Sequence, residues 1–277
     1  AKNGEAFTVA YDLPNLEAYS ESCAALGLQL FALSMQQTGP DARYADVIER
    51  VMYNNMLSST SLDGKAFFYE NPLEIYLADV DKERHVLPER RTQLPIRHRL
   101  EVFNCSCCPP NINRIFARVG DFFFSETQDA LVVNQYACLT LANDKADIKM
   151  ITDYPVSGTI KFEIGKCAYK KIMLRKPFWC DNFTLEGADY TLNDGYIETD
   201  GGVGGFTLTF EMRPYFVKAR PEVRSDCGRV ALMYGPIVYC MEKLDNPYAL
   251  NALKVLIDAP VRPVANKNYL FPDFVAE

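Results

Sequence analysis

The spacing of apolar residues changes once along this chain, near residue 128. Up to that point apolar side chains recur about every 3.6 residues, the period of an amphipathic helix. Beyond it they alternate with polar ones in short runs separated by Gly, Asn, Asp and Pro, which is typical of half-buried strands. The pattern predicts a multidomain α and β chain, with a helical domain over residues 1–128 and an antiparallel β-sandwich domain over residues 129–277.

The helical part has recognisable starts and stops. Gly39-Pro40 ends one helical pattern, and Asp41 is suited to cap the next. Pro109-Pro110 opens a further helix, since proline is accepted in the first helical turn. The predicted helices cover residues 16–37, 41–58 and 111–124, with a short aromatic strand at 67–69 and a charged loop at 79–101. Three helices with apolar faces this broad need partners on more than one side, which predicts that further structure is supplied from elsewhere.

The β part is punctuated by turns. Strands are predicted at residues 131–133, 159–164 and 206–210, and Asn193-Asp194-Gly195 is a turn signal between two others. The run from residue 229 to residue 240 is typical of two apolar strands hinged at Gly235-Pro236.

Composition excludes several classes of protein. The chain has 277 residues, of which 48% are hydrophobic and 23% are charged, with a formal net charge of −7. Lys and Arg are scattered singly, so we expect no nucleic-acid partner. No apolar run approaches the roughly 18 residues that span a bilayer, so we expect no membrane partner either.

Nine cysteines stand against only two histidines, His85 and His98. Three of the nine fall within Cys105–Cys108, unlike the evenly spaced framework of a small secreted domain. A reducing compartment, or protection of the thiols by metal, fits this usage better. A cytoplasmic location is therefore favoured, with the periplasm as the alternative because the native N-terminus is not visible.

Cys107 and Cys108 lie just before a predicted helix, where the positive end of the helix dipole lowers a thiol pKa. Adjacent cysteines rarely pair with each other, but both can ligate one metal. A four-ligand zinc site would need further donors, and Glu21 and Cys23 offer a carboxylate and a thiol. On a regular helix these two side chains point to nearly opposite sides, so they share a metal only if the helix begins there or is irregular. The alternative for Cys23 is a small buried apolar residue.

Five separated motifs occur in an order that resembles glycoside hydrolase family 127, which is related to family 146 and includes retaining β-L-arabinofuranosidases. The matching segments are Gly4-Glu5-Ala6-Phe7, Glu21-Ser22-Cys23, Glu49-Arg50, Phe68-Tyr69-Glu70-Asn71-Pro72-Leu73 and Cys107-Cys108-Pro109-Pro110-Asn111. The resemblance implies the C-terminal part of an (α/α)6 barrel followed by a β-sandwich. It also implies that a companion chain or further sequence supplies the N-terminal half of the barrel.

The resemblance implies roles for seven residues. Cys107 would be the nucleophile and Glu5 the general acid/base, in a reaction that releases terminal β-L-arabinofuranose or a related furanose from an oligosaccharide or plant glycan. Tyr69 and Glu49 would line the sugar site, and a Zn²⁺ ion would be held by Glu21, Cys23, Cys107 and Cys108. Cys105 and Ser106 receive no role.

Each role has an alternative on the residues alone. Glu5 could be a solvated carboxylate, Glu49 an exposed charge or an ion-pair partner, and Tyr69 a core aromatic. For the whole chain, the alternative is a non-catalytic, zinc-stabilised carbohydrate-binding or scaffold module.

Overall fold

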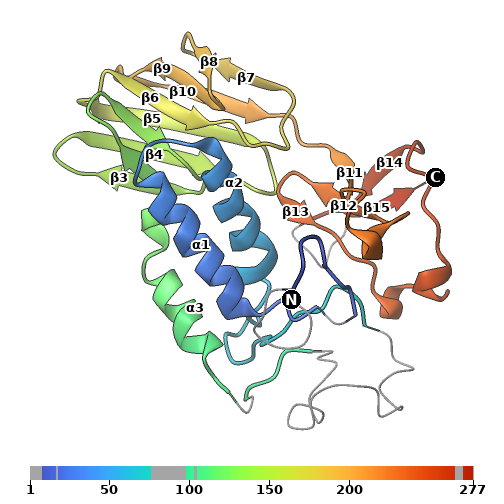
Figure 1. The fold of residues 1–277 in the computed structure, drawn as a ribbon. Coiled ribbons are helices and arrows are strands. Elements are labelled where there is room, and N and C mark those ends of the chain that lie inside the picture. Colours follow the sequence, from blue (N-terminus) through green and yellow to red (C-terminus); the bar gives the residue numbers. More distant parts are fainter. Residues whose placement is uncertain (1–7, 17, 76–97, 103–104, 266–270, 277) are drawn as a thin grey trace. The chain divides into compact units, whose positions relative to one another are not determined.

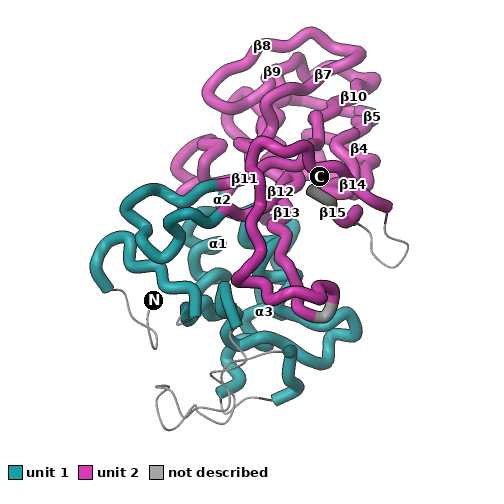
Figure 2. Tube along the Cα trace, turned by 90° about the vertical axis from the view of Figure 1, so that its right-hand side faces the viewer, with its two compact units in different colours: residues 1–34, 47–120, 218–229 teal, residues 35–46, 121–217, 230–277 magenta. Residues whose placement is uncertain are grey.

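The computed structural model describes residues 8–16, 18–75, 98–102, 105–265 and 271–276. The chain forms two compact units, each of which is built from three separate stretches of the sequence (Figure 2). Unit 1 comprises residues 1–34, 47–120 and 218–229, and unit 2 comprises residues 35–46, 121–217 and 230–277. The division into domains 1–128 and 129–277 is contiguous, unlike these units, and it stays a prediction.

The three predicted helices are confirmed, with different limits (Figure 1). The first starts later than predicted because Ser20 has a φ of 33° and Glu21 forms an isolated bridge to Glu70. The helices and single helical turns are α1 (Ser22–Gln36), α2 (Ala42–Val51), the π-helix η1 (Met52–Met56), α3 (Cys108–Phe116), and the 3-10 turns η4 (Val119–Phe122), η5 (Arg224–Asp226), η6 (Lys243–Asp245) and η7 (Leu250–Ala252).

Asp41 caps α2 as predicted. Its carboxylate accepts the backbone N–H of Arg43 at 3.0 Å, which satisfies one of the orphan donors of the first turn. The predicted strand at 67–69 is wrong as a strand, because Phe67 forms only isolated bridges, to Thr60 and Leu100. Most of the predicted loop at 79–101 lies outside the described residues.

Unit 2 is built on two five-stranded sheets, with strand orders β1-β2-β6-β9-β8 and β3-β4-β5-β10-β7. All pairings described in the two sheets are antiparallel except β2 with β6, which are parallel. The strands are β1 (Phe124–Glu126), β2 (Ala130–Val133), β3 (Leu139–Ala142), β4 (Ala146–Thr152), β5 (Thr159–Cys167), β6 (Lys171–Arg175), β7 (Phe183–Glu186), β8 (Thr191–Asn193), β9 (Tyr196–Asp200), β10 (Gly204–Phe210), β11 (Pro214–Lys218), β12 (Val230–Tyr234), β13 (Ile237–Val238), β14 (Val261–Val264) and β15 (Asp273–Ala276).

The predicted turns are confirmed where they can be seen. Asp194 and Gly195 have φ values of 44° and 81° between β8 and β9, the pair of positive φ values that a type I′ hairpin turn requires. Gly235, with a φ of 53°, lies between the antiparallel strands β12 and β13, as the hinge at Gly235-Pro236 predicted.

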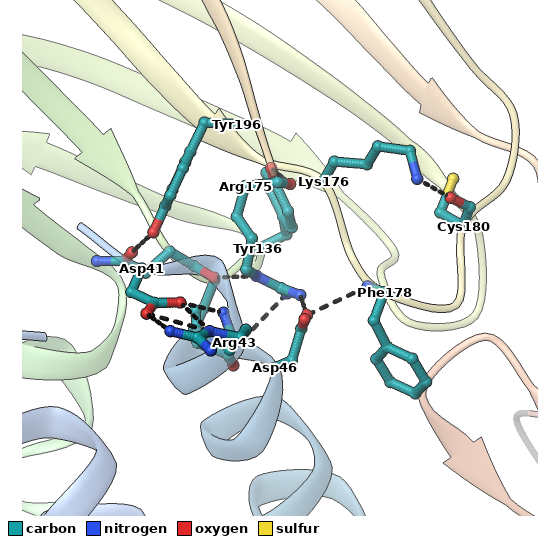
Figure 3. A network of polar contacts seen from close by, with 12 residues as sticks. Asp41, Arg43, Asp46, Tyr136, Arg175, Lys176, Phe178, Cys180 and Tyr196 are labelled. Carbon is teal, nitrogen blue, oxygen red and sulfur yellow. Dashed lines mark hydrogen bonds and ion pairs between the residues drawn. The ribbon is translucent and has the colours of Figure 1, made fainter. Parts of the chain in front are cut away.

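Strand β2 is buried on both faces of its sheet. All four residues of β2 are buried, and Val132 forms a cluster with Tyr196 and Ala42, the first residue of α2. The segment 35–46 therefore covers this face within unit 2. It is also held by an ion pair, because the guanidinium of Arg175 reaches Asp46 (Figure 3).

Among the described helices, none has the length and apolar character needed to cross a bilayer. The location of the protein stays a prediction, as does the (α/α)6 barrel.

Candidate metal centre

The backbone around Ser22 directs the side chains of Glu21 and Cys23 toward the same candidate metal position. The Ser22 N–H donates to the Tyr69 carbonyl at 3.0 Å, and the Ser22 hydroxyl donates to the Phe68 carbonyl at 2.7 Å. Glu21 is thereby held in extended backbone, while Cys23 lies in the first turn of α1. The helix begins at Ser22, between Glu21 and Cys23, and this is the condition under which the sequence analysis allowed these two residues to share a metal.

Cys107 and Cys108 reach the same point from the start of α3. Cys107 is the N-cap residue and Cys108 the first residue of the helix, with proline in the first turn. The Cys23 Sγ lies 3.5 Å from the Cys107 Sγ and 3.6 Å from the Cys108 Sγ, and the two adjacent sulfurs are 3.9 Å apart. The Cys107 Sγ also lies 3.5 Å from Glu21 Oε1.

These distances fit a tetrahedral zinc site. One ligand atom from each of Glu21, Cys23, Cys107 and Cys108 lies within 4.8 Å of the other three. Thiolates about 2.3 Å from a central zinc lie about 3.8 Å from one another, which matches the sulfur separations here. A disulfide would need about 2.05 Å, and all nine cysteines of the chain are free. The donor set therefore fits a thiophilic divalent cation.

The thiols of this site are hard to ionise without a cation. Burial, followed by the neighbouring Cys23, raises the pKa of Cys107 to about 12 and also raises the pKa of Cys108. Burial therefore opposes the lowering of the thiol pKa that the helix N-terminus predicts. A bound metal ion would supply the positive charge that keeps these sulfurs deprotonated.

Tyr69 lies beside the nucleophile candidate. Its hydroxyl forms a hydrogen bond with Cys107, which lowers the pKa of that thiol and partly opposes burial. The Tyr19 hydroxyl donates to the Tyr69 hydroxyl at 3.5 Å, and the two rings meet edge to face. Burial and this contact raise the pKa of Tyr69 well above its usual range, so it remains a neutral donor. Tyr69 is buried, as the core alternative predicted, and it also reaches the site.

The remaining predicted site residues are not all brought to the cluster. Glu49 lies in α2 and is only 1% exposed, so the alternative of an exposed charge is wrong. Glu5 lies outside the described residues. Cys105 is exposed and is not part of the four-residue group.

Sequence reasoning missed one polar side chain at the cluster. The Asn111 Nδ2 donates to the Cys23 Sγ at 3.1 Å, and Arg114 donates to the Asn111 Oδ1. Asn111 is the last residue of the Cys-Cys-Pro-Pro-Asn motif. It lies three residues after Cys108 and therefore on the same face of the helix. That spacing is the signal that could have identified it.

Comparisons with known proteins agree with this reading of the motifs. The model of the β-L-arabinofuranosidase GH127 catalytic domain matches residues 1–121, and that of the glycoside hydrolase family 127 C-terminal domain matches residues 214–268. A non-reducing end β-L-arabinofuranosidase from Bifidobacterium longum subsp. longum is 34% identical over 260 residues. That alignment covers 88% of this chain and 38% of the relative.

Solved structures of GH127 proteins are also similar to this chain. A GH127 β-L-arabinofuranosidase from Geobacillus stearothermophilus T6 matches with a TM-score of 0.82 and 34% identity, over 97% of this chain and 44% of the other. A second GH127 β-arabinofuranosidase matches with a TM-score of 0.80 and 30% identity, over 98% of this chain and 44% of the other. The chain thus spans less than half the length of these relatives.

Sequence and fold similarity place this chain within the glycoside hydrolase families. The two matched domains together cover more than half of it. The chain belongs to glycoside hydrolase family 127.

Proposed function

We propose that this chain is part of a retaining glycoside hydrolase that releases terminal β-L-arabinofuranose, or a related furanose, from plant glycans. Cys107 is the nucleophile and Glu5 the general acid/base. The single observation that carries the proposal is the convergence of Glu21, Cys23, Cys107 and Cys108, whose ligand atoms lie within 4.8 Å of one another.

Zinc is the proposed metal, and when bound it would keep Cys107 in the thiolate form that attacks carbon. Glu21, Cys23 and Cys108 would hold the ion together with Cys107, and their combined negative charge would leave the Cys107 sulfur electron-rich. The hydroxyl of Tyr69 fixes the direction of the sulfur through its hydrogen bond. Cys107 is half-buried whereas Cys108 is fully buried, so Cys107 is the more accessible of the adjacent pair.

The reaction then proceeds in two displacements. In the first, the Cys107 sulfur attacks the anomeric carbon and forms a C–S bond, the glycosidic C–O bond breaks, and the Glu5 carboxyl gives its proton to the leaving oxygen. In the second, the Glu5 carboxylate takes a proton from water. The water oxygen attacks the same carbon, the C–S bond breaks, and the thiolate returns. Two inversions give net retention.

Additional helices complete the proposed sugar site. We place the helices of this chain in an (α/α)6 barrel, with the other helices coming from further sequence or from a companion chain. Two features support this: the chain spans less than half of its relatives, and α1 carries the exposed apolar residues Leu28 and Phe31.

The nucleophile is tested by substitution in the complete enzyme, assayed with an aryl β-L-arabinofuranoside. Cys107→Ser should abolish turnover, whereas Cys138→Ser, which changes an exposed thiol in unit 2, should retain it. Unchanged turnover in Cys107→Ser would refute the nucleophile assignment.

Metal analysis tests the ligand set separately. We expect about one zinc per chain, released by a chelator, with loss of binding in Cys108→Ser. A fully folded protein without zinc would contradict the site. A complete wild-type protein that binds zinc but does not hydrolyse the aryl β-L-arabinofuranoside would instead favour the non-catalytic, zinc-stabilised module.

A further inference from the structure

We propose that Asn111 is a positioning residue for the metal ligand Cys23, and that Arg114 fixes the orientation of its amide. The proposal rests on the zinc-binding role given above to Cys23. It adds a second layer of contacts around the site and assigns a role to the polar residue that ends the Cys-Cys-Pro-Pro-Asn motif.

The geometry places the amide against the sulfur. Asn111 lies one helical turn after Cys107 and Cys108 on α3, and helical side chains lean toward the N-terminus of their helix. The Asn111 Nδ2 therefore reaches the end of the helix where the cluster lies, and it approaches the Cys23 Sγ to 3.1 Å. Cys23 belongs to α1, so this contact joins the starts of two helices within unit 1.

Arg114 determines which end of the amide faces the sulfur. A guanidinium has donors only, and its Nη1 contacts the Asn111 Oδ1. The amide oxygen must therefore point to Arg114, three residues further along α3, and the NH₂ group must point to Cys23. Without Arg114 the amide could rotate and present an oxygen to a thiolate, which is repulsive.

The donor set gives such a contact a purpose. Three thiolates and one carboxylate place four negative charges around one divalent ion, and the charges repel one another. An N–H donor on the Cys23 sulfur offsets part of this repulsion and restrains the side chain in its ligating position. Cys107 receives its hydrogen bond from Tyr69 instead. The two half-buried sulfurs are thus held by different donors from different segments.

Zinc affinity tests the proposal. The full chain is titrated in competition with a chromophoric chelator, comparing Asn111→Leu with Asn113→Leu, the same substitution at an exposed position of the same helix. We expect Asn111→Leu to bind zinc about 10- to 100-fold more weakly than wild type, and Asn113→Leu to bind as wild type does. With Co²⁺ as the probe, the sulfur-to-cobalt charge-transfer band should shift in Asn111→Leu alone.

Arg114→Met supplies a second variant, one that leaves Asn111 in place and keeps the test decisive if Asn111→Leu does not fold. It should weaken zinc binding, and it should add nothing in the Asn111→Leu background, because both act through one hydrogen bond. Wild-type-like affinity and an unshifted cobalt band in both single variants would overturn the positioning role while leaving the zinc site standing. A wild-type chain that binds no zinc would overturn the metal centre and this inference together.

Discussion

The buried pair of Arg175 and Asp46 in unit 2 gives the sharpest test of how this fold is held together (Figure 3). The Arg175 side chain is 0% exposed, and its Nη1 donates to Asp46 Oδ1 at 2.6 Å. Its Nε donates to the Asn134 carbonyl, also at 2.6 Å. Asp46 in turn accepts the backbone N–H of Phe178 at 3.2 Å. The perturbation is Arg175→Met, which keeps an apolar side chain of some length but removes every donor.

The expected loss is large because the partners stay behind. The Asp46 side chain is only 15% exposed, so Arg175→Met leaves a carboxylate with little access to water and the Asn134 carbonyl without this donor. Breaking one side of a buried ion pair typically costs about 3–5 kcal/mol. The pair of Arg43 and Asp41 has a similar separation, 2.7 Å, but the Arg43 side chain is 86% exposed. Arg43→Met should therefore cost at most about 1 kcal/mol.

The chain carries its own probe for this experiment. Its single tryptophan, Trp179, lies in unit 2, where its ring stacks on Tyr154 and meets Phe210 edge to face. Intrinsic fluorescence during guanidinium unfolding therefore reports on the unit that contains Arg175. A loss of about 4 kcal/mol should lower the unfolding midpoint by about 1 M, from the usual dependence of stability on denaturant.

A double variant separates the cost of keeping the Asp46 charge without Arg175 from the net contribution of the pair to stability. Asp46→Asn removes the charge but keeps an oxygen for the Phe178 N–H, so Arg175→Met with Asp46→Asn should be more stable than Arg175→Met alone. The reasoning fails if Arg175→Met costs no more than Arg43→Met. It also fails if the double variant is less stable than Arg175→Met.

Three smaller predictions concern single positions. Asp41→Ala should cost about 1 kcal/mol of unfolding free energy at pH 7, measured by urea unfolding. The hydrogen bond with Arg43 lowers the pKa of Asp41 in the folded chain from its ordinary value of 3.8, so the charged cap contributes fully above that value. The stabilities of wild type and variant should converge as the pH falls through the lowered pKa. Gly195→Ala should lower the melting temperature, since φ is 81° and the new Cβ would lie 2.8 Å from Ala42, whereas Gly202→Ala, with no atom within 4 Å, should not. Cys105→Ser should leave the zinc content unchanged in elemental analysis, and a loss of zinc would enlarge the ligand set.

Those parts of the fold that depend on near neighbours in the chain could be predicted from the sequence. The Asp41 cap and the Asn193-Asp194-Gly195 turn each need only two or three consecutive residues. The position of Cys107 and Cys108 at one helix start is likewise local, and the order of the motifs indicated Glu21 and Cys23 as further ligands. The late start of α1 could not be predicted, because it depends on the bridge from Glu21 to Glu70.

Contacts between distant segments escaped sequence reasoning for a physical reason. The parallel pairing of β2 with β6 joins strands that are separated by three others in the chain, and alternation alone does not reveal strand direction. Asn111 meets Cys23 across 88 residues. In both cases the local pattern was interpreted correctly, but the partner lay beyond the range over which periodicity or capping acts.

The two arginine-aspartate pairs show that a contact which sequence analysis cannot predict can contribute more to stability than one which it can. Arg43 lies two residues from Asp41, so its pairing is visible in the sequence, yet the pair is exposed and contributes little. Arg175 lies 129 residues from Asp46, and at the end of a short strand it resembles any solvated charge. Burial reverses their importance, because Arg175 at the end of β6 meets Asp46 of the segment 35–46 with a side chain that is 0% exposed. The energetic weight of a charged residue in this chain therefore follows from which surface covers it, a property that only the folded structure supplies.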